Sequence, residues 1–479
     1  MAADNSGCPG TASALELGHL IARREVSAVD VLDNFLARYE RLNPHLNAIV
    51  AMDVEAARSE ARQAEARALG GATLSALDGI PITVKDNIFV AGLPATWGSR
   101  IYARFRPPCD DIGIARLRAA GANLVAKTNT PEFALAAHTD NLLFGATRNP
   151  WNPDLTPGGS SGGAAAALAA GLAPLAVGTD AGGSIRRPAA YTGVVGFRPS
   201  TGRIPRAFGF PPLAHDFQVV APAARTVDDT YLLFRTMAGA DARDRSSLCF
   251  HDYPLPEQLN ERQLPRLRIR CVFAIDAAPV DPEVRENVAA AAGVLADLGH
   301  IVDEGPPPYE LTQVEQIWST LSSAGLARVV AQQHDWKTRV HPASRSIAER
   351  GLTVPSHAYI GALEATHELR VRLAAFFEDI DIVLTPASAS LPWPVGKPYP
   401  EQIAGRDAGP RGGALFSTFV NAGGLPAVAV PVTPSSAGIP IGMQLAARFG
   451  ADVLLLRLAR EYEDAAPWAG RWPTLNLHS

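Results

Sequence analysis

The chain has 479 residues, of which 47% are hydrophobic and 19% charged, and its formal net charge is −5. This composition is typical of a soluble globular protein, and the negative balance offers no basic surface for nucleic acid. The sequence has no uninterrupted apolar run of about eighteen residues, the length that a membrane-spanning helix needs. Residues 1–10 lack the basic start and apolar centre of a secretory signal. We therefore expect a cytoplasmic protein with no membrane or nucleic-acid partner.

The cysteines are scattered along the chain, at Cys8, Cys109, Cys249 and Cys271. None forms the C-x-x-C spacing of a zinc site, and the set does not resemble a disulfide framework. We interpret them as ordinary thiols in a reducing compartment and expect no metal.

Residues 11–69 have the apolar periodicity of helices. The pair Asn43-Pro44 predicts a break between two of them. Residues 55–67 alternate glutamate and arginine in good helix formers, which is typical of a solvated helix face. An N-terminal helical layer is therefore expected.

Two short apolar runs that follow each end in a lysine. Residues 80–84 read as a strand that carries Lys85 just past its end, and residues 123–127 read as a strand that ends in Lys127. An amphipathic helix is expected at 112–120, directly before the second strand. Helix followed by strand is the rhythm of an α/β fold whose sheet is covered by helices.

The stretch 156–199 contains two glycine-serine turns, GGSSGG at 158–163 and GGS at 182–184. An alanine-rich helix at 164–170 follows the first turn, and a buried strand at 175–177 leads to the second. Serines between glycines lie where the backbone turns sharply and can approach a ligand, so they are candidate nucleophiles. Successive N–H groups around Gly182 and Gly183 can also form a nest for an anion.

Turns of this kind also occur in proteins of two other functions. The segment GGSSG fits the G-x-S-x-G elbow of a Ser-His-Asp hydrolase, for which His138 could serve, but a proline-rich loop at 149–157 replaces the strand that the elbow requires. Neither turn has the Gly-Lys-Ser/Thr ending of a P-loop or the spacing of a dinucleotide fold. Both alternatives are disfavoured.

The rest of the chain continues the α/β alternation, with a polar excursion at 241–263. Asp281 and Pro282 occupy the N-cap and N1 places of a helix that Gly299 ends. Further helices are expected at 227–238, 309–333, 357–377 and 451–464, and strands at 267–273, 301–302, 381–386 and 427–430. The aromatic residues of the middle third are expected mainly in the core: Trp318, Trp336, Tyr359, Phe376 and Phe377.

Taken together, GGSSGG, the alanine-rich helix, GTDAGGSIR, GFRPS and the upstream GIPITVKDN resemble the amidase signature hydrolases. The resemblance implies one α/β/α domain over residues 1–479, with a large mixed central sheet covered by helices. Within it we expect an N-terminal helical layer at about 11–69 and a signature core at about 78–235. A variable, pocket-forming region at about 240–380 and C-terminal strands and a helix at about 381–465 complete the expected domain.

The same resemblance implies a Ser–cis-Ser–Lys triad. It assigns Ser184 as the nucleophile, Ser160 as the bridging serine after a cis peptide bond, and Lys85 rather than Lys127 as the base. A lysine can take a proton only when neutral, so the site should be dry. Further roles fall to the oxyanion N–H groups of Ala181, Gly182, Gly183 and Ser184, to the supporting Ser161, Asp180 and Arg186, and to the pocket residues His138, Thr139, Phe416 and Phe419.

The implied function is an amidohydrolase that cleaves the C–N bond of a small linear amide, and possible substrates include esters and carbamates. No cofactor and no metal are expected, the partner is a small-molecule amide, and the chain is expected as a monomer or homodimer. One alternative is the amidase subunit of a glutamine-dependent tRNA amidotransferase, although residues 344–370 lack the glycine- and tyrosine-rich pattern associated with it. A second alternative is a non-catalytic scaffold on the same fold, which the filled triad positions disfavour.

Overall fold

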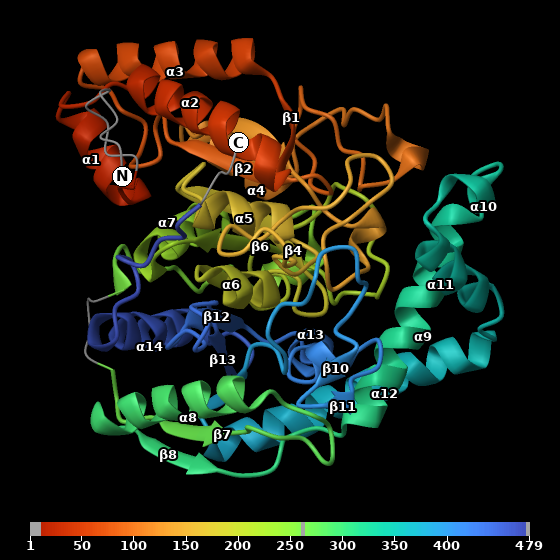
Figure 1. Ribbon diagram of the computed structural model, residues 1–479. Coiled ribbons are helices and arrows are strands. Elements are labelled where there is room, and N and C mark those ends of the chain that lie inside the picture. Colours follow the sequence, from red (N-terminus) through yellow and green to blue (C-terminus); the bar gives the residue numbers. More distant parts are fainter. Residues whose placement is uncertain (1–10, 260–263, 476–479) are drawn as a thin grey trace.

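The computed structural model describes residues 11–259 and 264–475. Residues 1–10, which include Cys8, and the end of the 241–263 excursion lie outside the described part. An eleven-stranded mixed sheet runs through the molecule, and helices flank it (Figure 1). This arrangement confirms the α/β fold with a large mixed sheet that the resemblance implies.

The strands of this sheet lie in an order that differs from their order in the chain: β1 (Ile49–Met52), β3 (Asn123–Thr128), β2 (Pro81–Lys85), β4 (Leu175–Asp180), β6 (Val219–Ala224), β5 (Val195–Arg198), β12 (Ala427–Pro431), β13 (Gly442–Ala447), β9 (Ile382–Pro386), β7 (Arg268–Cys271) and β8 (Ile301–Glu304). Strand β2 is parallel to both β3 and β4, whereas β4, β6 and β5 are successively antiparallel. Strands β10 (Gln402–Ile403) and β11 (Arg406–Asp407) form a separate hairpin.

Three helices form the N-terminal layer, drawn in red and orange in Figure 1: α1 (Ala14–Ala22), α2 (Ala28–Leu46) and α3 (Val54–Leu69). The break expected at Asn43-Pro44 is wrong, because α2 continues through Pro44 to Leu46. The Asn43 side chain accepts hydrogen bonds from the N–H groups of Ala48 and Ile49, which ties the end of the helix to β1.

Small residues let the central helices approach the sheet closely. Helix α5 (Gly162–Ala169) is completely buried, and its alanines pack with those of β4, β6 and α6 (Arg186–Thr192). Because an alanine side chain is small, α5 and α6 can lie close to the sheet. The two glycine-serine turns at the starts of these helices therefore lie near the same sheet edge. Helices α4 (Ile112–Ala119) and α7 (Val227–Met237) pack against each other on the first half of the sheet.

The remaining helices belong to the second half of the chain. Helix α8 (Pro282–Asp297) begins as expected, since the Asp281 side chain accepts from the N–H groups of Glu283 and Val284. The others are α9 (Leu311–Val330), α10 (Trp336–Arg339), α11 (Pro342–Leu352), α12 (Ser356–Asp379), α13 (Thr418–Gly423) and α14 (Asp452–Ala465). Short 3-10 turns occur at η1 (Arg100–Tyr102), η2 (Glu132–Ala134), η3 (Arg245–Phe250) and η5 (Gly412–Ala414).

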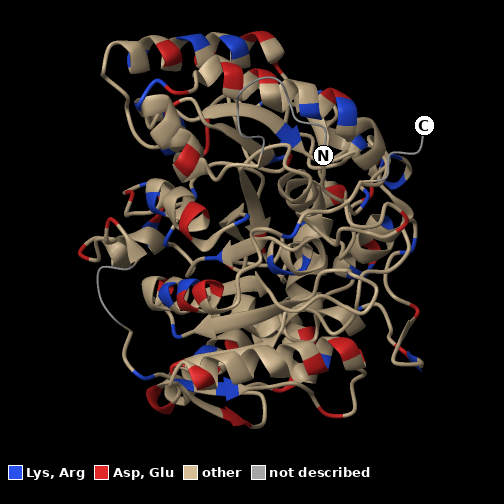
Figure 2. Cartoon of the chain, turned by 60° about the vertical axis from the view of Figure 1, so that its left-hand side comes forward, with Lys and Arg blue, Asp and Glu red and all other residues tan. Residues whose placement is uncertain are grey.

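Charged residues are concentrated on the outer helices, whereas the central strands are mostly uncharged (Figure 2). Within the described ranges, no helix is both long and apolar enough to cross a bilayer. The charged groups that do lie inside the fold are therefore exceptions, and several of them surround the two glycine-serine turns.

Candidate active site

The site forms where two neighbouring parallel strands end. Lys85 is the last residue of β2, and Thr179 and Asp180 are the last residues of β4. Carboxyl ends of parallel strands meet at the same sheet edge, which is where α/β proteins place their ligands. The parallel pairing thus brings together two motifs that lie far apart in the sequence.

Three hydroxyl groups surround the Lys85 amine. Its Nζ lies 2.8 Å from Ser160 Oγ, 2.9 Å from Ser161 Oγ and 2.9 Å from Thr179 Oγ1. An ammonium would donate to all three, whereas a neutral amine would donate to two and accept from the third. The contact set therefore suits a lysine that receives a proton from a serine hydroxyl.

Burial decides the charge of this lysine. Lys85 is completely buried, and burial lowers its pKa well below the usual range, although the Asp180 carboxylate opposes the shift. Lys127 is also buried, and burial lowers its pKa to about 8 against the effect of Asp86. It donates instead to the backbone oxygen of Ile88, so only Lys85 of these two lysines contacts the serines.

The peptide bond between Gly159 and Ser160 is cis, as the resemblance implies. Gly159 packs so closely on the preceding loop that an added Cβ would overlap the His138 carbonyl oxygen. Around it, Thr139 Oγ1 donates to Gly158 O and accepts from Gly162 N. The first turn is therefore fixed by backbone contacts on both sides.

Ser184 lies in the second turn, with 9% of its surface exposed. Its backbone oxygen accepts from Ser161 N at 3.0 Å, which joins the two turns directly. In the described part of the chain, its hydroxyl makes no hydrogen bond with Ser160. The Lys85–Ser160 contact of the expected relay is therefore present, whereas the Ser184–Ser160 contact is not. Catalytic hydrogen bonds often form only in the substrate complex.

One expected oxyanion donor is already used. Gly183 N donates to Asp180 Oδ1 at 2.9 Å, and Ile185 N donates to Asp180 Oδ2. An N–H group held by a carboxylate is not free for an oxyanion, so Gly183 shapes the turn instead. Among the described residues no acceptor is assigned to the N–H groups of Ala181, Gly182 and Ser184, so these three remain as candidate donors.

A buried ion pair supports this turn. Arg186 and Asp180 are completely buried and joined by two hydrogen bonds of 3.0 and 2.9 Å. Burial by itself raises the pKa of Asp180, but the Arg186 guanidinium outweighs it and holds that pKa well below the usual range. Asn421 bonds to both partners, and Gln444 accepts from Arg186, so the charges are satisfied by polar side chains of the C-terminal segment.

The structure places the four expected pocket residues in different surroundings. His138 is half-buried, burial lowers its pKa, and its Nδ1 lies 3.1 Å from Pro398 O. Thr139 is buried, and its hydroxyl holds the first turn by donating to Gly158 O. Phe416 and Phe419 are wrong as pocket residues, because both are completely buried in a hydrophobic cluster, where Phe419 stacks on Tyr309.

Three residues near the turns were missed as site residues. Thr179 contacts Lys85, Ser417 Oγ donates to Gly182 O at 3.0 Å, and the Trp318 ring packs on Gly182. The sequence contains a signal only for Thr179, which belongs to the GTDAGGS motif. Ser417 and Trp318 come from distant segments and reach the turn only through the tertiary fold.

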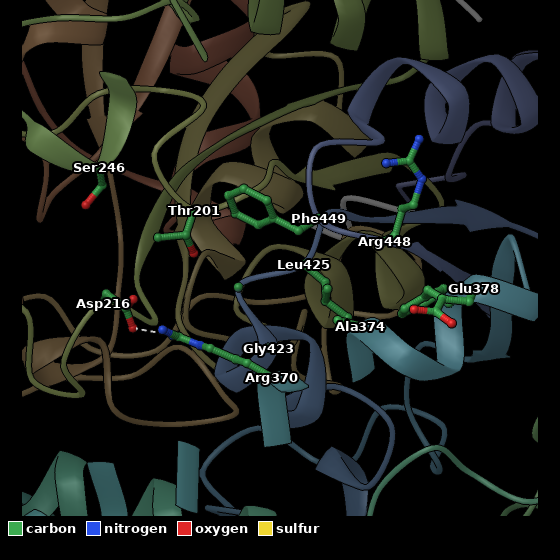
Figure 3. A pocket seen from close by; sticks show the side chains of 12 residues that line it. Thr201, Asp216, Ser246, Arg370, Ala374, Glu378, Gly423, Leu425, Arg448 and Phe449 are labelled. Carbon is green, nitrogen blue, oxygen red and sulfur yellow. Dashed lines mark hydrogen bonds and ion pairs between the residues drawn. The ribbon is translucent and has the colours of Figure 1, made fainter. Parts of the chain in front are cut away.

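A cavity of about 530 Å³ is lined by residues of α12 and of the segment 423–425 (Figure 3). Its lining residues, drawn in Figure 3, include the ion pair Asp216–Arg370 and the backbone of Gly423 and Gly424, but not Ser184. It is thus separate from the triad. Within the described ranges, no group of three or more His, Cys, Asp or Glu side chains is placed to hold a metal.

The family comparison matches residues 30–456 to the model described as Amidase. The chain belongs to the amidase signature family. It is therefore an enzyme of a family that acts on C–N amide bonds, which confirms the hydrolase and amidase expectations at that level.

Two sequence relatives illustrate the match, and both are subunits of a glutamyl-tRNA(Gln) amidotransferase. The chain is 35% identical over 483 residues to the one from Picosynechococcus sp., covering 95% of this chain and 98% of the relative. It is 34% identical over 496 residues to the one from Roseiflexus sp., covering 95% and 96%.

Solved structures of hydrolases are similar as well. A bacterial aryl acylamidase has a TM-score of 0.88 at 27% identity, covering 96% of this chain and 99% of its own. The 6-aminohexanoate cyclic dimer hydrolase has a TM-score of 0.86 at 28% identity, covering 98% and 99%.

These relatives contradict the expectation of a small-molecule substrate with no nucleic acid. The sequence relatives are subunits of an enzyme named for a tRNA. A net charge of −5 constrains only the contacts that this chain makes itself, not those of an assembly that contains it. The exclusion of nucleic acid was therefore wrong.

Proposed function

We propose that the chain hydrolyses an amide through an acyl-enzyme on Ser184. The Ser184 hydroxyl attacks the carbonyl carbon, and its proton passes through Ser160 to neutral Lys85. Lys85 returns this proton through Ser160 to the leaving nitrogen, which departs as ammonia or an amine. Water then attacks the ester, which releases the carboxylic acid and regenerates Ser184. The 2.8 Å contact between Lys85 Nζ and Ser160 Oγ is the observation that carries this proposal.

The N–H groups of Ala181, Gly182 and Ser184 would stabilise the oxyanion in this mechanism. Loss of one such donor typically costs about 10²–10³ in rate. Asp180 and Arg186 would hold these groups in place without contacting substrate, and Ser161 would orient the lysine through its 2.9 Å contact. The continuous sheet supports a single catalytic domain.

For the substrate, the sequence relatives favour the amidotransferase alternative over a small-amide hydrolase. Relatives at 34–35% identity over nearly the whole chain are amidotransferase subunits. We infer that the chain acts as the amidase subunit of a glutamine-dependent tRNA amidotransferase, releasing ammonia from glutamine for use on a tRNA-bound amino acid. A cytoplasmic location follows from this function.

Independent hydrolysis of small amides is the second candidate. The solved structures that support it are named as hydrolases or acylamidases that act on other amides, at 27–28% identity. The two candidates differ in substrate and partners but share the chemistry at Ser184.

One experiment tests the chemistry and separates the candidates. A fluorophosphonate probe should label Ser184, and a Ser184→Ala variant should remain unlabelled. The purified chain is then assayed with glutamine and with a panel of alkyl and aryl amides, alone and with candidate partner subunits. Glutamine hydrolysis that rises when partners and tRNA are added supports the first candidate, whereas rapid turnover of other amides by the chain alone supports the second.

A further inference from the structure

Two arginines lie against the nucleophile turn and have no part in the proton relay. Arg187, three residues after Ser184, is only 3% exposed. Its Nη1 donates to Gly159 O at 3.1 Å and its Nη2 to Gly182 O at 3.5 Å, so it spans both glycine-serine turns. Its Nε is buried and has no hydrogen-bond partner among the described residues.

Arg411 approaches the same turn from the loop before η5. Its guanidinium lies 5.5 Å from the centre of the Trp318 ring, and a Cβ added at Gly182 would lie 3.2 Å from the edge of that ring. The side chain keeps 31% of its surface exposed. A ligand at the turn can therefore reach it.

The bonds of Arg411 leave part of the guanidinium unused. One nitrogen donates to Thr418 Oγ1 at 2.7 Å. The Nε lies 3.6 Å from Glu315 Oε1, which is too long for a hydrogen bond, and this buried Nε has no other partner among the described residues. The bond to Thr418 thus holds the guanidinium in place, while its hydrogen-bond donors are not all used by the described residues.

The charges around the turn do not cancel. Burial lowers the pKa of Arg187, and it lowers that of Arg411 to about 10, to which the charge of Arg187 contributes. Asp180 is hydrogen-bonded to Arg186 and Asn421 and also acts electrostatically on Arg187, whereas Glu315 is the acid beside Arg411. Asp180 and Glu315 are thus two acids against three arginines, Arg186, Arg187 and Arg411, which leaves a positive site that an anion would stabilise.

We propose that Arg411 binds a carboxylate on the acyl part of the substrate, with Arg187 adding positive potential beneath it. The substrate is then an amide whose acyl chain ends in a carboxylate, such as the monoamide of a dicarboxylic acid, a class to which glutamine also belongs. A planar guanidinium suits this group because its N–H donors match the two carboxylate oxygens. This inference rests on the proposed hydrolysis at Ser184.

The test compares two amides of nearly equal shape, glutaramate, which carries a carboxylate, and the neutral diamide glutaramide. The wild-type enzyme should prefer glutaramate in kcat/KM by about tenfold or more, since a charge-assisted pair is stronger than a neutral contact. Arg411→Gln should reduce this preference to about onefold, mainly by raising KM for glutaramate, and Arg411→Lys should restore part of it. Arg345→Gln, at an exposed arginine of α11, is the matched control and should keep the wild-type preference.

A second measurement does not need turnover. Glutarate should slow fluorophosphonate labelling of Ser184 in the wild type and should require a much higher concentration in Arg411→Gln. A wild-type enzyme without preference for glutaramate and without protection by glutarate overturns the carboxylate site, as does an Arg411→Gln variant that keeps both. Absence of labelling at Ser184 in the wild type would instead overturn the proposed function itself.

Discussion

Lys85 Nζ lies 2.8 Å from Ser160 Oγ, between residues that are 75 positions apart in the sequence. The lysine is the last residue of β2, and the serine precedes α5, which packs on β2 and β4. The amine is completely buried, and burial lowers its pKa, which favours the neutral form that can accept a proton from this hydroxyl. Proton exchange between the two groups is therefore the simplest chemistry that this geometry supports.

Removing each of the triad side chains should reduce catalysis, and the loss should differ among the three. Ser184→Ala should remove turnover and covalent labelling, and Lys85→Ala and Ser160→Ala should each reduce kcat by about 10²–10⁴, because each removes proton transfer. Steady-state kinetics on folded variants measures this. His138→Ala tests the rival mechanism, and a loss as large as that of Lys85→Ala would require a histidine base.

The pH dependence of kcat/KM should reflect the protonation state of Lys85. The pKa of Lys85 is lowered by burial, so the neutral, active form increases as pH rises through that value. We expect kcat/KM to rise with pH and to reach a plateau on the alkaline side. A profile that falls above neutrality while the protein stays folded would contradict a lysine base.

Lys127 is the control for this assignment, since its pKa of about 8 makes it a second group that can titrate in the same range. A Lys127→Gln variant that stays folded should keep the wild-type pH profile. If the pH at which kcat/KM rises is different in this variant, Lys127 contributes to the pH dependence.

Breaking the buried ion pair should destabilise the protein. Arg186→Gln leaves the Asp180 carboxylate without its charged partner, which typically costs about 3–5 kcal/mol in the free energy of unfolding. Because the folded-state pKa of Asp180 is depressed, its contribution is present above the unfolded-state pKa and is lost as pH falls. Denaturant unfolding of wild type and variant should therefore differ most near neutral pH, and equal stability there would disprove this role.

The first turn should not tolerate a side chain before Ser160. Gly159→Ala places a Cβ on the His138 carbonyl oxygen, so the turn must shift and labelling of Ser184 should slow by at least about tenfold. Gly293→Ala is the matched control. This glycine lies within α8 and an added Cβ meets nothing within 4 Å, so the variant should keep full activity and gain about 0.5–1 kcal/mol in stability.

Local patterns in the sequence determined much of this protein. The motifs GGSSGG, GTDAGGSIR and TVKDN identified the residue types of the site, and most helices and strands lie where periodicity and capping residues predict them. Asp281-Pro282, for example, begins α8 as expected. These features depend on neighbouring residues, whose backbone preferences and side-chain caps act over a few positions.

Tertiary contacts decided the rest. The resemblance assigned Lys85 as the base, but the contact that supports it depends on the pairing of β2 with β4, and only the turn geometry shows that Gly183 N–H is occupied by Asp180. Phe416 is buried rather than exposed to a pocket for the same reason. Whether a donor is free or a ring is covered depends on groups that arrive from distant parts of the chain, and a local pattern carries no record of them.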